Sequence, residues 1–265
     1  MTGANPAGVR FVAIGDSFTE GVGDELPDGT VRGWADLVAE GWAASRGHSI
    51  EYANLAIRGK LVWPIVEEQL EPALALKPTH LSFNGGGNDM LRPRTPIARI
   101  ADAFTKVLQH CDDEGVRLIL LSGANPTAQL PLGRVIGRRG DELSRAVLER
   151  IEGRDDVIRA LNWPDRELTD PSFWSEDRLH MGPRGHHRVA ARVLDALGEK
   201  VPTDWWSLPA NSPATRVGRQ AYFREHLGPW IKRRLTGTSS GDGREPKFGG
   251  AWVTVEPAPA PDDGS

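Results

Sequence analysis

A serine, a histidine and an aspartate in this sequence could together form a nucleophile, a base and the carboxylate that orients the base. Ser17 follows the apolar run that ends at Ile14, and Asp177 and His180 stand three residues apart. A serine hydroxyl is a weak nucleophile near neutral pH, so it needs an imidazole to take its proton and an acceptor to hold that imidazole in one tautomer. One loop could place the Asp177 carboxylate against Nδ1 of His180 and leave Nε2 for Ser17.

Two further positions could stabilise negative charge that develops on a substrate oxygen. Asn88 lies in the run Asn-Gly-Gly-Gly-Asn-Asp, which begins at Asn84 and ends another apolar run, and its amide is a hydrogen-bond donor. Gly59 follows a third apolar run and offers a backbone N–H, as Ser17 itself does. Preorganised donors of this kind are typically worth ~3 kcal/mol each in the transition state. Ser17, Gly59 and Asn88 thus each offer a donor that could stabilise such an oxygen, although Gly59 by itself is an ordinary turn glycine.

Each of these residues alone also has an ordinary structural explanation. A serine after Gly-Asp commonly caps the next segment, and Gly-Gly-Gly-Asn-Asp is typical of a turn. The chain has seven histidines, and we interpret His186 and His187 as surface or loop-packing groups at the start of a helix. The Gly-x-Ser-x-Gly nucleophile elbow is absent around Ser17, so a different serine-hydrolase scaffold is needed. The combination of residues, each placed after a predicted strand, favours catalysis.

Apolar and amphipathic runs alternate along the chain and predict an α/β fold. Predicted strands cover residues 9–14, 50–55, 80–83, 116–121 and 157–161. Apolar residues at three- and four-residue steps predict helices through 34–42, 61–76, 97–111, 141–152 and 185–197. Such alternation calls for parallel strands joined by right-handed crossovers, with helices on both faces of the sheet. Ligands bind at the carboxyl ends of such strands, which is where the candidate residues lie.

Length and charge narrow the classes of protein to consider. The 265 residues are enough for one large domain, which we place at 1–200 and follow with a C-terminal extension, 201–265. The formal net charge of -4 and a pI near 6.0 do not favour nucleic-acid binding, which selects basic surfaces. The sequence contains no apolar stretch approaching the ~18 residues of a transmembrane helix. We therefore expect no nucleic-acid partner and no transmembrane segment.

The sequence gives little reason to expect a cofactor, a metal ion or secretion. Cys111 is the single cysteine, so no intramolecular disulfide can form, and the first residues lack a signal-peptide pattern. A cytoplasmic location follows as the simplest expectation. A zinc site at His180, His186 and His187 would lack the usual HExxH or paired-cysteine spacing. The glycines before Asn88 match neither GxxxxGK[ST] nor GxGxxG, so nucleotide binding is not indicated.

Four separated blocks resemble the SGNH hydrolase family, also called GDSL esterases and lipases. They are Gly15-Asp16-Ser17, Asn54 to Gly59, Gly86 to Asp89 (GxND) and Asp177 to His180 (DxxH), within residues 9–198. The resemblance implies a three-layer α/β/α sandwich with a parallel, flavodoxin-like sheet of about five strands. It also implies Ser17 as nucleophile, His180 as base with Asp177 as its partner, and Ser17, Gly59 and Asn88 as the oxyanion hole. The sequence departs modestly from the family in Phe18-Thr19-Glu20, which follows the serine.

The activity that these residues predict is serine esterase hydrolysis of a small-molecule carboxylic ester, with no cofactor and no metal. A short-chain acyl or acetyl ester is expected because no long hydrophobic lid is apparent. One alternative is acyl transfer to an alcohol by the same residues. Another is a noncatalytic binding module whose basic segment, 212–235, contacts anionic lipid or an acidic protein. A partly helical extension packed on the core, with a mobile end, is favoured over that peripheral contact.

Overall fold

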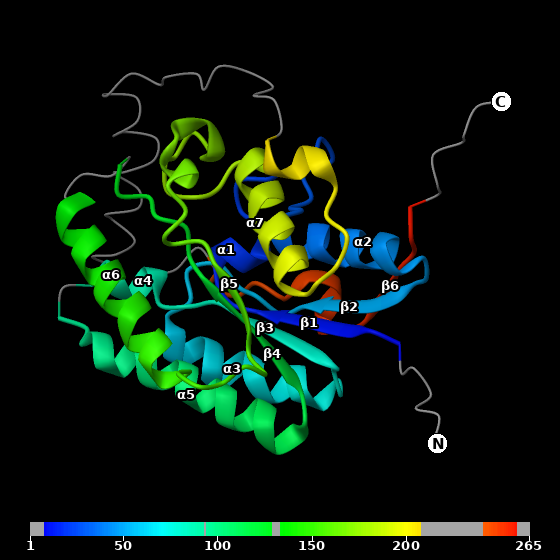
Figure 1. Ribbon diagram of the computed structural model, residues 1–265, viewed down its shortest axis with the longest axis horizontal. Helices are drawn as coiled ribbons and strands as arrows, with labels where there is room; N and C mark the ends of the chain where they lie inside the picture. Colours follow the sequence, from blue (N-terminus) through cyan, green and yellow to red (C-terminus); the bar gives the residue numbers. More distant parts are fainter. Residues whose placement is uncertain (1–7, 93, 129–132, 208–240, 259–265) are drawn as a thin grey trace.

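The computed structural model describes residues 8–92, 94–128, 133–207 and 241–258, and a six-stranded sheet lies at its centre (Figure 1). The strands are β1 (Arg10–Ile14), β2 (Ile50–Asn54), β3 (His80–Phe83), β4 (Arg117–Ser122), β5 (Ile158–Leu161) and β6 (Val253–Val255). Their order is β5-β4-β3-β1-β2-β6. The first five strands are parallel and follow the flavodoxin-like order. The predicted parallel sheet is confirmed, whereas the antiparallel pairing of β6 with β2 was not predicted.

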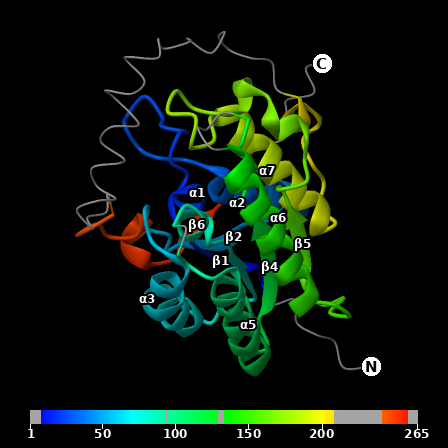
Figure 2. The same ribbon diagram turned by 90° about the vertical axis from the view of Figure 1, so that its left-hand side faces the viewer.

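Helices cover both faces of this sheet and complete the predicted three-layer sandwich (Figure 2). One face carries α3 (Val62–Ala75), α5 (Ile97–Glu114) and α6 (Gly133–Arg150), and the other carries α2 (Trp34–Arg46) and α7 (Pro183–Ala196). Two single-turn helices, α1 (Ser17–Glu20) and α4 (Gly87–Met90), follow β1 and β3. Short 3₁₀ segments occupy Glu167–Thr169, Pro171–Phe173, Thr203–Trp206 and Lys247–Gly250.

The apolar runs of the sequence form strands that are buried on both faces. In β1, Phe11 and Ala13 pack against α2 and α7, whereas Val12 and Ile14 pack against α3 and α5. Successive side chains of a strand point to opposite faces, so a strand covered on both sides must be apolar throughout. The described residues form one hydrophobic cluster on each face of the sheet, and each helix contributes one apolar stripe to the cluster on its face. This explains why the helices read as amphipathic and the strands as continuous apolar runs.

Helix α6 begins eight residues before the predicted start at Asp141. Its first two turns are rich in arginine and glycine, and the buried residues of the helix begin only at Gly140. Polar contacts hold this part of the helix in place, since the Arg139 guanidinium donates to the carbonyl oxygens of Met90 and Thr95. Apolar periodicity could not predict this helical segment, because hydrogen bonds from charged side chains to backbone carbonyl groups hold it in place.

Residues 241–258 return to the domain rather than extending away from it. Beyond the pairing of β6 with β2, the Lys247 ammonium donates to Asp36 Oδ2 at 2.7 Å and to the Arg32 carbonyl oxygen at 2.6 Å. Burial, partly offset by Lys247, raises the pKa of Asp36 to about 6. The basic segment 212–235 and the chain beyond residue 258 lie outside the described residues. The boundary near residue 200 therefore stays a prediction.

Candidate active site

The candidate nucleophile lies in the first turn after β1. Ser17 begins α1, and the Asp16 carboxylate caps that turn by accepting a hydrogen bond from the Phe18 N–H at 3.0 Å. The turn is tight enough to require glycine at position 15, because a Cβ there would lie 2.4 Å from Thr19 Oγ1 and 3.0 Å from the Asn84 carbonyl oxygen. The turn presents the Ser17 hydroxyl at the carboxyl edge of the sheet, where the sequence predicted it.

The Asp177 to His180 loop is a tight hairpin that precedes α7. An isolated antiparallel bridge joins Trp174 to Met181, and the Ser175 N–H donates to the His180 carbonyl oxygen at 2.9 Å. At the tip, Arg178 has φ of 59°, in the left-handed region that non-glycine residues rarely adopt. This conformation turns the chain sharply enough to bring the Asp177 and His180 side chains together.

The hairpin completes a continuous hydrogen-bonded chain from carboxylate to hydroxyl. Asp177 Oδ2 lies 2.5 Å from His180 Nδ1, and His180 Nε2 lies 3.0 Å from Ser17 Oγ. Asp177 Oδ1 accepts from the backbone N–H groups of Leu179 and His180 and from the Ser175 hydroxyl. Burial acts to raise the pKa of Asp177, but the bonds and charge of His180 outweigh it and hold that pKa below its usual range. The carboxylate is therefore ionised and can fix one imidazole tautomer.

Asn88 lies beside this chain of groups, in α4. Its side-chain Nδ2 donates to the Lys60 carbonyl oxygen at 3.0 Å and, in a longer bond, to Asp16 Oδ2 at 3.3 Å. Because the second bond is long, a substrate oxygen that enters the site could take over or share that hydrogen. Asn88 and Ser17 both line the same cavity.

Gly59 lies in a loop that is tied to the site at the residues on either side of it. The Arg58 N–H donates to Glu20 of α1 at 2.7 Å, and the Lys60 carbonyl oxygen accepts from Asn88. Gly59 has φ of 78°, which favours glycine, and its N–H donates to no group in the described part of the chain. The cavity lining does not include Gly59. The structure thus places Gly59 next to the other candidate donors but not in the cavity wall.

Two buried carboxyl groups adjoin these donors. Burial, opposed mainly by the bond from the Phe18 N–H, raises the pKa of Asp16 to about 6. Burial likewise raises the pKa of Asp89, whose Oδ2 accepts from the Val62 N–H at 2.9 Å. Asp89 therefore holds the start of α3 against α4, and Asp16 holds Asn88 against α1.

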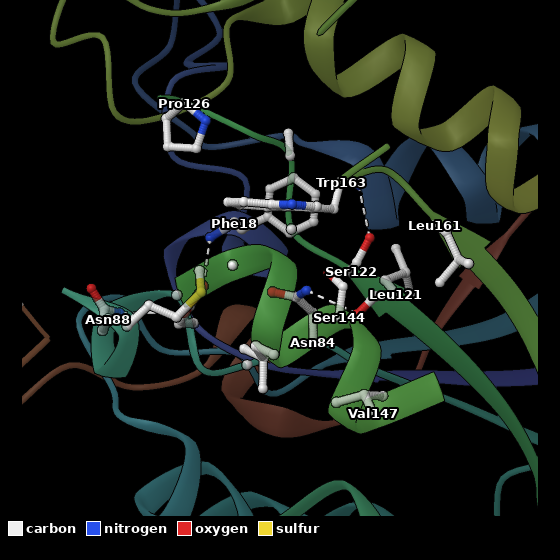
Figure 3. A pocket seen from close by; sticks show the side chains of 18 of the residues that line it. Phe18, Asn84, Asn88, Leu121, Ser122, Pro126, Ser144, Val147, Leu161 and Trp163 are labelled. Atoms are coloured by element: carbon white, nitrogen blue, oxygen red, sulfur yellow. Dashed lines mark hydrogen bonds between the residues drawn. The ribbon is translucent and has the colours of Figure 1, made fainter. Parts of the chain in front are cut away.

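A cavity of about 250 Å³ opens beside Ser17 and His180 and extends under α6. Figure 3 shows side chains that line it: Trp163 lies above Ser144 and Val147 lies below, with Asn88 at the left edge of the view. Met90, Trp174 and Met181, which lie near the four blocks in the sequence, line this cavity.

Two other aromatic or charged neighbours of the blocks do not line the cavity. Arg58 pairs with Glu20, and the Trp63 indole N–H donates to the Arg99 carbonyl oxygen. Sequence reasoning missed the pairing of Glu20 with Arg58. A usable signal existed, because Glu20 follows Ser17 by three residues, and Arg58, which carries the opposite charge, directly precedes Gly59. Sequence reasoning also missed the wall formed by α6, for which no local signal existed.

The other histidines of this region have structural contacts. His186 is fully buried, and its Nδ1 accepts from the Trp34 N–H at 3.0 Å. Burial lowers the pKa of His186 to about 4, so it is neutral. Its Nε2 lies 3.3 Å from the Val22 carbonyl oxygen, so of the two interpretations, surface or loop packing, the structure agrees with loop packing. Within the described residues, no three His, Cys, Asp or Glu side chains are arranged to hold a metal ion.

Comparison with known proteins decides the family. The sequence profile of the GDSL-like lipase/acylhydrolase family matches residues 13–188, which is well over half of the chain and contains all four blocks. This chain belongs to the GDSL-like lipase/acylhydrolase family. Membership of this family places the protein in the class of carboxylic ester hydrolases. No curated protein matches the sequence.

Solved structures similar to this GDSL-like protein share its fold. A lipase from a goat rumen metagenome, Lip_vut3, is 17% identical with a TM-score of 0.59, and the match covers 71% of this chain and 97% of that one. A catalytic mutant of the acetylxylan esterase Axe2 from Geobacillus stearothermophilus is 19% identical with a TM-score of 0.58, covering 73% and 96%. The esterase EstA from Pseudoalteromonas sp. is 16% identical with a TM-score of 0.57, covering 71% and 96%. Each of these three matches leaves more than a quarter of the GDSL-like chain uncovered.

In the described part of the GDSL-like chain, no helix combines the length and the apolar character that crossing a bilayer requires.

Proposed function

We propose that this protein is a serine esterase that hydrolyses carboxylic esters through an acyl-enzyme. The observation that carries the proposal is the unbroken contact from Asp177 to His180 to Ser17, with distances of 2.5 Å and 3.0 Å. Three residues from two distant parts of the chain meet at hydrogen-bonding distance in the order that nucleophilic catalysis requires. This contact supports catalysis over a noncatalytic binding module, which would need no such alignment.

In the first half of the reaction, Ser17 Oγ attacks the ester carbonyl carbon while His180 Nε2 takes the hydroxyl proton. The carbonyl oxygen becomes negative and accepts hydrogen bonds from the backbone N–H groups of Ser17 and Gly59 and from the Asn88 amide. The intermediate then collapses: the bond to the alcohol oxygen breaks, His180 gives its proton to that oxygen, and the alcohol leaves. Asp177 holds the imidazole and stabilises its protonated form throughout.

In the second half, water replaces the alcohol. His180 takes a proton from the water as its oxygen attacks the acyl carbon, and the bond to Ser17 Oγ breaks as His180 returns the proton to that oxygen. The products are the carboxylic acid and the free enzyme. An alcohol in place of water would give acyl transfer, and product analysis in the presence of competing alcohols distinguishes the two reactions.

A fluorophosphonate label tests the nucleophile directly. Modification should map to the peptide that contains Ser17, and Ser17→Ala should abolish both labelling and turnover of a chromogenic ester while leaving the circular dichroism spectrum unchanged. Retained turnover in Ser17→Ala overturns the proposal.

The role of Asp177 is tested by comparing substitutions at two neighbouring carboxylates. Asp177→Asn removes the acceptor that fixes the imidazole tautomer, so kcat should fall roughly a thousandfold to ten-thousandfold. Glu176→Gln changes the adjacent, exposed carboxylate and is the matched control. Equal activities of the two variants would contradict the role of Asp177.

A further inference from the structure

We propose that the cavity under α6 binds the acyl chain of the substrate and that the protein prefers medium-length acyl esters of roughly six to ten carbons. This inference rests on the proposed function, since it assigns the acyl side of the same reaction. It differs from the sequence-based expectation of an acetyl or short-chain ester, which depended on the lack of a lid and could not take account of a cavity inside the domain.

The cavity is continuous with the reacting groups. Ser17, Asn88 and His180 line one part of it, and residues of α5, α6, β4 and β5 line another part. An acyl carbon bonded to Ser17 Oγ would therefore carry its chain directly into this space. The lining from α6 is Ile136, Gly140, Leu143, Ser144, Val147 and Leu148.

The depth of the cavity follows from the direction of α6. A helix that follows a parallel strand starts at the carboxyl edge of the sheet and runs back along the face, so later residues of α6 lie deeper. Val147 lies two turns beyond Gly140, which at 1.5 Å per residue is roughly 10 Å. Phe104 of α5 and Leu120 of β4 line the cavity as well and belong to the buried hydrophobic core. The inner part of the cavity is thus far enough from Ser17 to hold several methylene groups.

The chemistry of the wall selects an alkyl chain over a sugar or a charged group. Among the described residues that line the cavity, Asp16 is the one carboxylate and none is a lysine or an arginine. Two of the polar side chains there already have partners. Asn84 Nδ2 donates to the Leu121 carbonyl oxygen, and Ser122 Oγ accepts from the N–H groups of Asn162 and Trp163. A polyol would lose hydrogen bonds to water that this wall replaces only in part, whereas an alkyl chain loses none.

Trp163 is held as a rigid wall of this cavity. Its indole N–H donates to Asp141 Oδ1 at 2.8 Å, and its ring packs against Gly140, where a Cβ would lie 1.9 Å from the indole. Any larger residue at position 140 would displace the ring. The wall is therefore built by the sequence of α6 rather than left to a mobile side chain.

The volume of the cavity limits the length of the acyl chain that it can hold. An apolar cavity of ~150 Å³ holds benzene, which has six carbons, so a space of about 250 Å³ has room for a chain of roughly six to ten carbons. Each buried methylene should raise kcat/KM about threefold to fourfold until the space is filled.

The acyl side of the ester occupies the cavity because the alcohol must leave. His180 protonates the departing alcohol, and its ring is partly open to solvent, so the alcohol has a direct way out on that side. The acyl chain stays bound to Ser17 through both halves of the reaction and benefits from burial under α6.

The experiment measures kcat/KM for p-nitrophenyl esters with acetyl, butyryl, hexanoyl, octanoyl, dodecanoyl and hexadecanoyl groups, together with acetate esters of alcohols of increasing length. We expect a maximum between hexanoyl and decanoyl lengths, at least a hundredfold above acetyl. A maximum at butyryl or a shorter group, at dodecanoyl or a longer group, or a dependence on alcohol length alone, overturns the proposal. If the turnover of any ester depends on Ser17, the proposed esterase function stands. Failure of the chain-length preference can therefore be distinguished from failure of the proposed function.

Variants of α6 test where the acyl chain of the substrate binds. Val147→Phe fills the inner part of the cavity and should lower the octanoyl-to-acetyl ratio of kcat/KM at least tenfold. Ser144→Phe, at a half-buried position on the same wall, gives the same test if Val147→Phe does not fold. Val135→Phe makes a comparable change on the exposed face of the same helix and should leave the ratio unchanged. Unchanged ratios in a folded cavity variant would overturn the assignment.

Discussion

Glu20 accepts three hydrogen bonds from Arg58, one from the backbone N–H at 2.7 Å and two from the guanidinium, Nε at 2.8 Å and Nη2 at 2.6 Å. Glu20 ends the helix that Ser17 begins, and Arg58 immediately precedes Gly59. This ion pair therefore ties the loop of one proposed oxyanion donor to the segment of the nucleophile. Arg244, from the returning C-terminal segment, lies 3.7 Å from the same carboxylate.

Glu20→Gln should lower both activity and stability. Glu20 is only 5% exposed, and loss of its charge weakens bonds of a kind that contribute about 1.5–3 kcal/mol each to the free energy of unfolding. A looser Gly59 loop should lower kcat tenfold or more with little change in KM, because its N–H acts as charge develops. Urea denaturation and steady-state kinetics measure the two effects.

The control for this variant is Glu114→Gln, which removes an exposed pairing with Lys77 far from the site. Its free energy of unfolding should change by less than about 1 kcal/mol, and its kcat should equal that of the wild type. If Glu20→Gln behaves like Glu114→Gln, the ion pair with Arg58 does not position the loop.

Asn88→Ala should lower kcat about a hundredfold and leave KM nearly unchanged, because its amide bond to the substrate oxygen strengthens only in the transition state. Asn88→Asp keeps the shape but places a second acceptor beside Asp16 Oδ2, so it should be at least as slow. Steady-state kinetics on one chromogenic ester separates the two parameters. A rise in KM with unchanged kcat would show that Asn88 binds substrate and transition state equally and is not an oxyanion donor.

Asp16 should make the protein less stable as the pH rises from about 4 to above 6. Its pKa in the folded protein is about 6, against 3.8 for an ordinary aspartate, so between these values the folded state holds a proton that the unfolded state releases. The folded state therefore loses stability as pH rises, by roughly 3 kcal/mol once the carboxyl is ionised in both states.

The measurement is the free energy of unfolding against pH for the wild type and for Asp16→Asn. The difference between the two should change by that amount between pH ~4 and ~7, with the wild type losing stability relative to the variant. Asp36, which shifts in the same direction, is present in both proteins and cancels. Parallel curves would mean that Asp16 titrates at its ordinary pKa.

The sequence alone determined the sandwich, the five parallel strands and the neighbourhood of the site. Each of these depends on a local signal: the apolar runs of β1 to β5, the amphipathic stripes of the helices, and short polar motifs at the ends of strands. Parallel strands carry their carboxyl ends to one edge, so Ser17, Asn88 and the Asp177 to His180 loop were predictable as neighbours.

Only the tertiary structure decided how the site is held and what space adjoins it. The bond of Glu20 to Arg58, the packing of Trp163 on Gly140 and the pairing of β6 with β2 each join segments distant in the chain. No local pattern encodes such contacts, because the same residue types are common on any surface. The cavity is likewise a property of how α5, α6 and the sheet pack together, since its volume is what their side chains leave unfilled.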